Sequence, residues 1–420
     1  MIKPAIVLVP AVFALTVASW AISPPMSGFI GGHQIAQLVG ALALTGFALG
    51  FVISTRMQLL DWAFDGLDKA YVAHKWLGIG SVGLAFAHVV LIGTTRGGHG
   101  QGHMHGQSMP MAQLGAPSLL LFVVLVLTAL VARRLRFEVW KTIHKFLVVP
   151  YVIGLIHYYG ASSYGALGTS PFSLWMDVLT VIGVASAVYA IAIYELTAFR
   201  FRYHVSAVRS VGSGATEITA TASRRPLPAK PGQFAFVKGT FGTIAMPSHP
   251  FTVSSGGCDP IQLTVKALSG HTSTWTSAVK PGDVLALAGP HGRFDYTRGL
   301  LRQIWIAGGI GVTPFRSFVQ SGLRDGFSID FFYAYHGADQ ACYTDELMAA
   351  SSDNLRVHLI DDTVQGFLTA QMLEDAVPAK TPVDVFFCGP VAMRDAVREE
   401  LAASKLQVHS FRFEEFEFGR

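Results

Sequence analysis

The hydrophobic pattern changes character near the middle of the chain. Up to about residue 196 the sequence consists of long apolar runs joined by short polar connections, whereas from Phe199 onward short alternating segments are separated by glycine and proline. A helix needs roughly 20 apolar residues to cross a bilayer. The first half therefore predicts an all-α bundle of six transmembrane helices, at residues 4–22, 34–53, 74–93, 114–132, 144–160 and 174–194.

The second half predicts two further domains. Six or so short strands with turn residues between them favour a small antiparallel β-barrel. After the barrel, strands alternate with helices, which is typical of an α/β nucleotide-binding domain. We therefore divide the chain into a membrane domain (residues 1–198), a β-barrel domain (199–298) and an α/β domain (299–420).

Composition limits the classes of function. Of the 420 residues, 51% are hydrophobic and 14% are charged, and the apolar excess lies in the first half. The net charge of +4 is spread along the chain, so no nucleic-acid partner is indicated. Cys258, Cys342 and Cys388 lie in the second half without paired spacing, which favours a reducing compartment over a disulfide frame or a structural zinc site.

The basic residues predict the orientation of the spans, because cytoplasmic loops carry an excess of lysine and arginine. The connections on one side hold Lys3, Arg56, Lys69, Lys75, Arg133, Arg134, Arg136, Lys141, Lys145, Arg200 and Arg202, whereas the other side has only Arg96. We expect a multi-pass protein of the cytoplasmic membrane with both termini in the cytoplasm. Residues 5–20 are interpreted as the first span rather than a secretory signal, since no convincing cleavage site follows.

Two of the apolar runs each contain two histidines. His74 and His88 are fourteen residues apart, and His144 and His157 are thirteen apart. On an ideal helix His74 and His88 lie ~21 Å apart and within ~40° of one face. Because ionisable residues inside a membrane are usually functional and imidazole is a common axial ligand of haem iron, this pattern predicts two stacked haem groups. The alternative is that each histidine is a buried residue bonded to a neighbour.

The order of the spans predicts which histidines meet. The third and fifth spans run in the same direction, so His74 is expected opposite His144 near the cytoplasm, and His88 opposite His157 near the outside. Thirteen residues leave His144 and His157 ~140° apart on a regular helix. Pro150 lies between them and removes a backbone hydrogen bond, so we expect a kink or bulge that turns His157 toward His88.

A loop on the outer side, residues 94–113, is rich in possible soft metal ligands. It holds His99, His103, His105, Met104, Met109 and Met111 among glycines. Imidazole and thioether groups can bind copper transiently. A flexible solvated loop with incidental histidines explains the same composition, and both interpretations stay open.

Two segments of the second half carry candidate cofactor chemistry. A strand ends in His249-Pro250-Phe251-Thr252, which alone is a weak signal. Gly308-Gly309-Ile310-Gly311-Val312-Thr313-Pro314 joins a strand to a helix, and such a turn brings backbone N–H groups close to a pyrophosphate. Further strands end at His336-Gly337 and Cys388-Gly389-Pro390, where an α/β sheet binds its ligands.

Taken together, these motifs resemble the membrane flavocytochromes of the NADPH oxidase and ferric reductase family, especially their compact bacterial members. The resemblance covers nearly the whole chain and implies a ferredoxin–NADP reductase-like module that binds FAD and NADPH or NADH, beside two b-type haems held by His74, His88, His144 and His157. The residues it implies for FAD are His249, Pro250, Phe251, Thr252, Lys266, Gly270, His271 and Thr272. Those it implies for the nicotinamide nucleotide are Gly308, Gly309, Gly311, Val312, Thr313, Pro314, His336, Cys388, Gly389 and Pro390. Phe418 would cover the isoalloxazine ring, or else pack as a core strand residue.

Two positions depart from the family pattern. His336 stands where relatives that prefer NADPH often have an arginine, so the choice between NADPH and NADH stays open. Ile92 stands where eukaryotic oxidases have a further histidine that helps meet oxygen, and the outer part of the second span has no arginine.

The resemblance implies hydride transfer from the nicotinamide to FAD, followed by single-electron transfer through the two haems. We expect an NAD(P)H oxidase that makes superoxide or hydrogen peroxide on the outer side. A ferric or cupric chelate reductase using the same electron path is the alternative, and a haem-binding membrane anchor without catalysis is a third hypothesis. No regulatory segment is recognisable in the sequence, so we expect activity without an obligatory protein partner.

Overall fold

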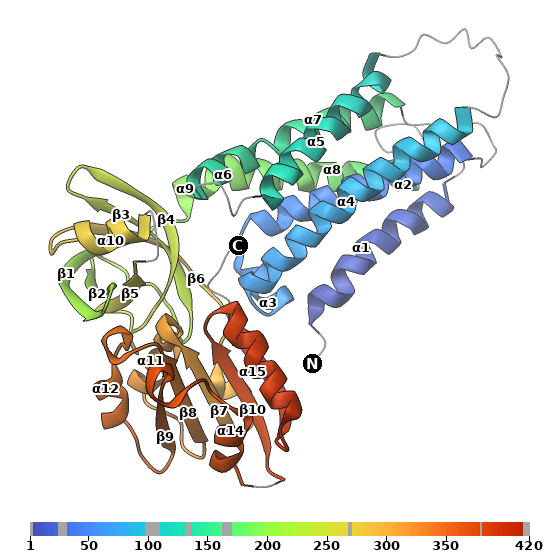
Figure 1. Ribbon diagram of the computed structural model, residues 1–420. Helices are drawn as coiled ribbons and strands as arrows, with labels where there is room; N and C mark the ends of the chain where they lie inside the picture. Colours follow the sequence, from blue (N-terminus) through green and yellow to red (C-terminus); the bar gives the residue numbers. More distant parts are fainter. Residues whose placement is uncertain are drawn as a thin grey trace. The chain divides into compact units, whose positions relative to one another are not determined.

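The computed structural model describes residues 3–23, 32–96, 110–131, 137–161, 170–267, 271–378 and 380–414. The chain forms two compact units, of which the first ends at Leu196 and the second begins at Thr197. The first unit is helical, and the second contains both β-sheets (Figure 1).

Apolar helices build the first unit. In chain order they are α1 (Pro4–Ala21), α2 (Gly32–Ser54), α3 (Gln58–Phe64), α4 (Leu67–Arg96), α5 (Gly115–Leu130), α6 (Phe137–Lys145), α7 (Val148–Ala161), α8 (Pro171–Val188) and α9 (Tyr194–Thr197). Within the described residues, five segments are long and apolar enough to cross a membrane, and α5 is apolar but has 16 residues. Apolar helices thus lie at all six predicted positions, although one of them is short.

Helix α2 lies at the centre of this unit and packs against both α4 and α8. Small side chains cover its buried face, including Ala36, Ala41, Ala43 and Ala48. Small residues let membrane helices approach closely, and this packing replaces the hydrophobic drive that is missing within lipid. The carbonyl groups of α2 consequently come within reach of side chains on α4.

Two spans differ most from their predicted bounds. Helix α4 begins at Leu67 rather than His74, because Leu67 is fully buried and Gly66, with φ of +128°, ends the preceding turn. The predicted fifth span is divided between α6 and α7. The break is a tightened turn in which Leu147 N donates to His144 O at 3.2 Å and Val149 N donates to Phe146 O at 2.9 Å. The expected irregularity is present, and it lies just before Pro150.

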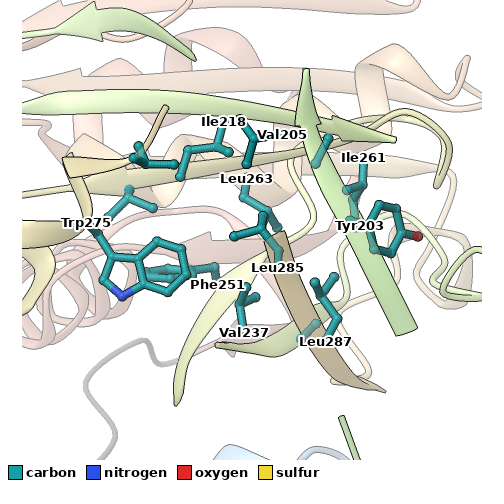
Figure 2. Close-up of a cluster of buried hydrophobic side chains, with 14 of the residues drawn as sticks. Tyr203, Val205, Ile218, Val237, Phe251, Ile261, Leu263, Trp275, Leu285 and Leu287 are labelled. Atoms are coloured by element: carbon teal, nitrogen blue, oxygen red, sulfur yellow. The ribbon is translucent and has the colours of Figure 1, made fainter. Parts of the chain in front are cut away.

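The second unit begins with a six-stranded antiparallel sheet in the order β4-β3-β6-β1-β2-β5. Its strands are β1 (Phe201–Gly212), β2 (Ala215–Ala222), β3 (Phe234–Phe241), β4 (Ile244–Thr252), β5 (Ile261–Lys266) and β6 (Val284–His291). Val253, just past β4, bridges Leu263 of β5, so the two edges of the sheet approach each other. The alternate residues that face inward, including Tyr203, Val237 and Leu285, form one apolar core (Figure 2). Helix α10 (His271–Ala278), which the sequence did not predict, places Trp275 in this core.

A five-stranded parallel sheet follows, in the order β11-β10-β7-β8-β9. Its strands are β7 (Arg302–Gly308), β8 (Ser328–Tyr335), β9 (Leu355–Asp361), β10 (Pro382–Cys388) and β11 (Gln407–Glu414). The main helices are α11 (Val312–Gln320), α12 (Thr344–Ala349), α13 (Asp362–Gln365), α14 (Ala370–Ala376) and α15 (Val391–Ala403). The chain moves outward from β7 to β9 and then returns to β10 on the other side of β7. The topological switch point, where α/β sheets bind ligands, therefore lies between β7 and β10.

Candidate functional site

The four histidines of the first unit form two pairs. The ring centres of His74 and His144 lie 5.8 Å apart, and those of His88 and His157 lie 6.1 Å apart. When two imidazoles bind the same metal ion from opposite sides through bonds of about 2 Å, their ring centres lie roughly 6 Å apart. The structure thus brings together the histidines that the order of the spans predicted to meet, at a spacing that suits a metal ion between them.

Backbone carbonyls of α2 orient the two histidines of α4. Nδ1 of His74 donates to Gly50 O at 3.0 Å, and Nδ1 of His88 donates to Ala36 O at 2.6 Å. A metal-bound histidine usually donates its other ring nitrogen in this way, which fixes the tautomer and leaves Nε2 to bind the metal. Nδ1 of His144 is buried without a hydrogen-bond partner among the described residues, and its ring stacks on Trp140 with centres 5.1 Å apart.

Glycines leave space beside these imidazoles. A Cβ atom at Gly115 would lie 2.9 Å from His157 Cε1, and one at Gly40 would lie 3.0 Å from His88 Nδ1. By contrast, a Cβ atom at Gly83 would meet nothing within 4 Å. A side chain at Gly115 would therefore force the His157 ring to shift, whereas one at Gly83 would not disturb any neighbour.

Several predicted residues lie outside the described part of the chain. These are Gly270, Phe418 and, in the outer loop, His99, His103, His105, Met104 and Met109. Met111 is described and is 50% exposed, and Ile92 lies in α4. The structure therefore does not test metal binding by the outer loop or the position of Phe418.

The two glycine-containing loops of the parallel sheet touch each other at the switch point. Gly309 has φ of +54°, which favours glycine, and a Cβ atom at Gly311 would lie 2.1 Å from Cys388 O. Thr313 Oγ1 donates to Ile310 O at 3.1 Å, which holds the turn at the start of α11. Cys388 is fully buried at the end of β10. The close backbone approach places the two loops side by side at the carboxyl edge of the sheet, where α/β sheets bind ligands.

On the antiparallel sheet, the predicted flavin residues lie along β4. His249 Nδ1 donates to Pro247 O at 2.9 Å, and Phe251 packs edge-on against Trp275 with ring centres 5.1 Å apart. Thr252 Oγ1 is buried and has no hydrogen-bond partner among the described residues, as expected of a group that a ligand would satisfy.

The remaining predicted flavin residues lie on β5 and α10. Lys266 Nζ donates to Gln340 Oε1 at 3.3 Å, so this lysine reaches the parallel-sheet domain. His271 and Thr272 form the first turn of α10, and the N-terminus of a helix is a position that favours a phosphate.

Helix α11 holds the two sheets of the second unit together. Arg316 Nη1 lies 3.0 Å from Glu217 Oε2 of β2, and both side chains are almost fully buried. Gly232 N donates to Ser317 Oγ at 2.8 Å, and Arg316 Nη1 also donates to Ser254 O at 3.4 Å. Since Ser254 follows Thr252 by two residues and Arg316 follows Thr313 by three, these bonds fix the β4 strand end relative to the glycine loop.

Sequence reasoning missed this ion pair. The only local signal was a single arginine after the glycine loop and a single glutamate within an otherwise uncharged strand pattern. His336, which was predicted, follows β8 with its side chain largely exposed.

Sequence profiles of three families match the chain. That of the ferric reductase like transmembrane component matches residues 39–155, that of an FAD-binding domain matches residues 200–291, and that of the oxidoreductase NAD-binding domain matches residues 305–399. The three matches follow one another in the order of the helical bundle, the antiparallel sheet and the parallel sheet.

Individual relatives agree with these matches. The ferric/cupric reductase transmembrane component 7 of Saccharomyces cerevisiae is 22% identical over 358 residues, which are 81% of this chain and 56% of the yeast protein. NADH-cytochrome b5 reductase 1 of Emericella nidulans is 29% identical over 157 residues, which are 33% of this chain and 51% of that protein. The chain thus spans about half the length of the curated relatives it matches.

Among solved structures, the flavohemoglobin of Malassezia yamatoensis has a TM-score of 0.51 at 16% identity and covers 96% of this chain and 98% of its own, a likeness of fold alone. The profile matches and the similarity to the yeast reductase agree with the order of the motifs along the sequence. The chain is therefore similar, in this order, to a ferric reductase like transmembrane component, an FAD-binding domain and an oxidoreductase NAD-binding domain, which together are the parts of a transmembrane oxidoreductase.

Proposed function

We propose that this protein transfers electrons from NADH or NADPH, through FAD and two b-type haems, to an acceptor on the outer face of the cytoplasmic membrane. The proposal rests mainly on the two histidine pairs. The ring centres of His74 and His144 lie 5.8 Å apart, and those of His88 and His157 lie 6.1 Å apart. No group of three or more His, Cys, Asp or Glu side chains in the described residues is arranged to hold a metal ion. Two protein ligands at each site suit haem iron, whose other ligands come from the porphyrin.

The residues of the chain would position these groups. When bound, FAD accepts a hydride and the haems pass single electrons. His74 with His144, and His88 with His157, would supply the axial ligands. His249, Pro250, Phe251, Thr252, Lys266, Gly270, His271 and Thr272 would hold FAD, and the loops at Gly308–Pro314 and Cys388–Pro390, with His336, would hold the nicotinamide nucleotide. Phe418 would cover the flavin ring until the nucleotide arrives.

For the acceptor we propose oxygen, with superoxide or hydrogen peroxide as the product. Because His88 and His157 would occupy both axial positions, oxygen would have to receive its electron without binding iron. The excess of basic residues in the other connections supports a cytoplasmic location of both termini, so the acceptor side would lie outside.

A second candidate is reduction of ferric or cupric chelates by the same path. The similarity to the yeast ferric/cupric reductase component over 81% of the chain favours it, and so does Ile92 in place of a histidine. Both candidates require the same cofactors and differ only in the group that takes the electron at the outer end.

One assay separates the two candidates. Purified protein supplied with FAD, haem and NADH or NADPH is mixed with cytochrome c, with and without superoxide dismutase. Inhibition of cytochrome c reduction by the dismutase is the result expected of an oxidase. If the dismutase does not affect cytochrome c reduction and chelated iron is reduced rapidly, the protein is a metal reductase and not an oxidase.

A further inference from the structure

Acidic side chains surround the residues that follow β8. Asp361, the last residue of the neighbouring parallel strand β9, accepts a hydrogen bond from Gly337 N at 3.1 Å. Asp362 Oδ1 accepts one from His336 Nδ1 at 2.7 Å. Asp339 is close as well, since a Cβ atom at Gly337 would lie 3.0 Å from Asp339 Oδ1. Three carboxylates thus lie around two residues at the carboxyl edge of the sheet.

In a dinucleotide-binding sheet, this edge is where the adenosine would be expected. Strand β8 is the neighbour of β7, whose carboxyl end leads into the loop Gly309–Gly311. In sites of this type the pyrophosphate binds at the glycine loop, and the ribose of the adenosine reaches the end of the next strand. There a carboxylate accepts a hydrogen bond from the 2′-hydroxyl of NAD, or an arginine binds the 2′-phosphate of NADP.

The carboxylates at this edge can accept a hydrogen bond from the 2′-hydroxyl of NAD and would repel the 2′-phosphate of NADP. Hydrogen bonds from the Thr363 side chain and backbone and from Gly337 N hold the pKa of Asp361 below its ordinary value, so its carboxylate stays ionised. In the part of the chain that the structure describes, no lysine or arginine is recorded in contact with His336, Gly337, Asp361 or Asp362. A 2′-phosphate would therefore bring a double negative charge next to carboxylates without a guanidinium to receive it.

We infer that Asp361 and Asp362 make NADH the preferred hydride donor and discriminate against NADPH. The inference rests on the proposed function and selects between the two nucleotides that it allows. His336 contributes by holding Asp362 at the strand end, while the carboxylates face the ribose of the adenosine. The preference expected from this charge arrangement is on the order of tenfold or more in kcat/KM.

Anaerobic stopped-flow reduction of the flavin in the full-length, FAD-loaded protein tests this. The flavin absorbance is followed with NADH and with NADPH over a range of concentrations, and the ratio of the second-order rate constants of flavin reduction, which correspond to kcat/KM in turnover, is compared. NADH is expected to be favoured on the order of tenfold or more. Equal or faster reduction by NADPH overturns this inference alone, whereas reduction by neither nucleotide overturns the proposed function.

Two substitutions test whether the preference for NADH arises from the carboxylates at this edge. Asp362→Asn removes one negative charge at the ribose, and the ratio is expected to move toward NADPH by several-fold. Asp353→Asn removes the same charge from an exposed position just before β9, at the opposite edge of the sheet, and should leave the ratio as it is. An unchanged ratio in Asp362→Asn, or an equal change in Asp353→Asn, contradicts the assignment.

Discussion

Arg316 of α11 and Glu217 of β2 form a buried ion pair 3.0 Å long between the parallel sheet and the antiparallel sheet. The guanidinium also lies over the ring of Tyr343, 3.9 Å from its centre, and Tyr343 donates to Glu217 at 3.0 Å. Three groups from different parts of the second unit thus satisfy one another away from water. Since the glycine loop precedes Arg316 directly, this contact determines where the loop lies relative to β4.

Glu217→Gln is expected to destabilise the second unit and slow flavin reduction. The substitution removes a carboxylate from a buried guanidinium that keeps a second one, since Arg316 Nε also lies 2.9 Å from Glu346 Oε1, and the loss is expected to cost about 1–3 kcal/mol. Urea denaturation and stopped-flow flavin reduction measure the two effects. Arg209→Met is the control, because Arg209 contacts the same carboxylate but is 61% exposed, and its loss should cost less than about 1 kcal/mol. Equal effects of the two substitutions would show that the buried contact has no special role.

Gly311→Ala is expected to weaken nucleotide binding. Gly311 has an ordinary helical backbone, so alanine causes no torsional strain, but its methyl group would lie 2.1 Å from Cys388 O and force the two loops apart. The KM for the nucleotide should rise on the order of tenfold, as judged from the loss of close backbone contact at a pyrophosphate. Gly257→Ala, where a Cβ atom meets nothing within 4 Å, should leave KM unchanged. An unchanged KM for the nucleotide in Gly311→Ala would show that this loop does not bind the nucleotide.

Gly115→Ala is expected to disturb the pair of His88 and His157 and to leave the pair of His74 and His144 unchanged. The new methyl group would lie 2.9 Å from His157 Cε1, so the imidazole has to move. Electron paramagnetic resonance should show one of two low-spin ferric signals changed or lost. Gly83→Ala adds the same methyl group to a membrane helix where it meets nothing, and both signals should persist. The proposed haem position is wrong if Gly115→Ala leaves both signals unaltered.

The stability of the parallel sheet should fall in acid because of Asp330. Burial opposes ionisation of this fully buried carboxyl, but hydrogen bonds from His358, Arg356 and Arg302 outweigh it and lower its pKa from 3.8 to about 2. A pKa lowered in the folded state stabilises the protein above the ordinary pKa, so the contribution, about 2 kcal/mol, is lost as pH falls from 4 to 2.

Urea denaturation curves of the full-length protein at several pH values between 5 and 2 measure this loss. Asp330→Asn should remove that part of the pH dependence. Asp325→Asn, at an exposed position, should retain it. The same dependence in Asp330→Asn and in the unaltered protein would rule out this carboxyl as its source.

Periodic and local features were predictable from the sequence, and long-range contacts were not. The apolar runs predicted the helices, and alternation predicted six or so short strands followed by an α/β arrangement, as the two sheets have. The histidine pairs were predictable because the order of the spans left one consistent arrangement. The break after His144 was expected, but its position depends on which carbonyls find donors near Pro150. The contacts of Arg316 with Glu217 and of His336 with Asp362 join distant segments and depend on strand order and register, which no local pattern contains.

We propose that His74, His88, His144 and His157 hold two haems that receive electrons from a nicotinamide nucleotide through FAD. The most direct test is the absorption spectrum of the purified protein before and after anaerobic addition of NADH, together with that of His88→Ala. The account predicts a Soret band from two haems per chain, reduction of both by NADH, and loss of about half of the band in His88→Ala. A protein without a Soret band after haem is supplied, or an undiminished band in His88→Ala, would contradict it.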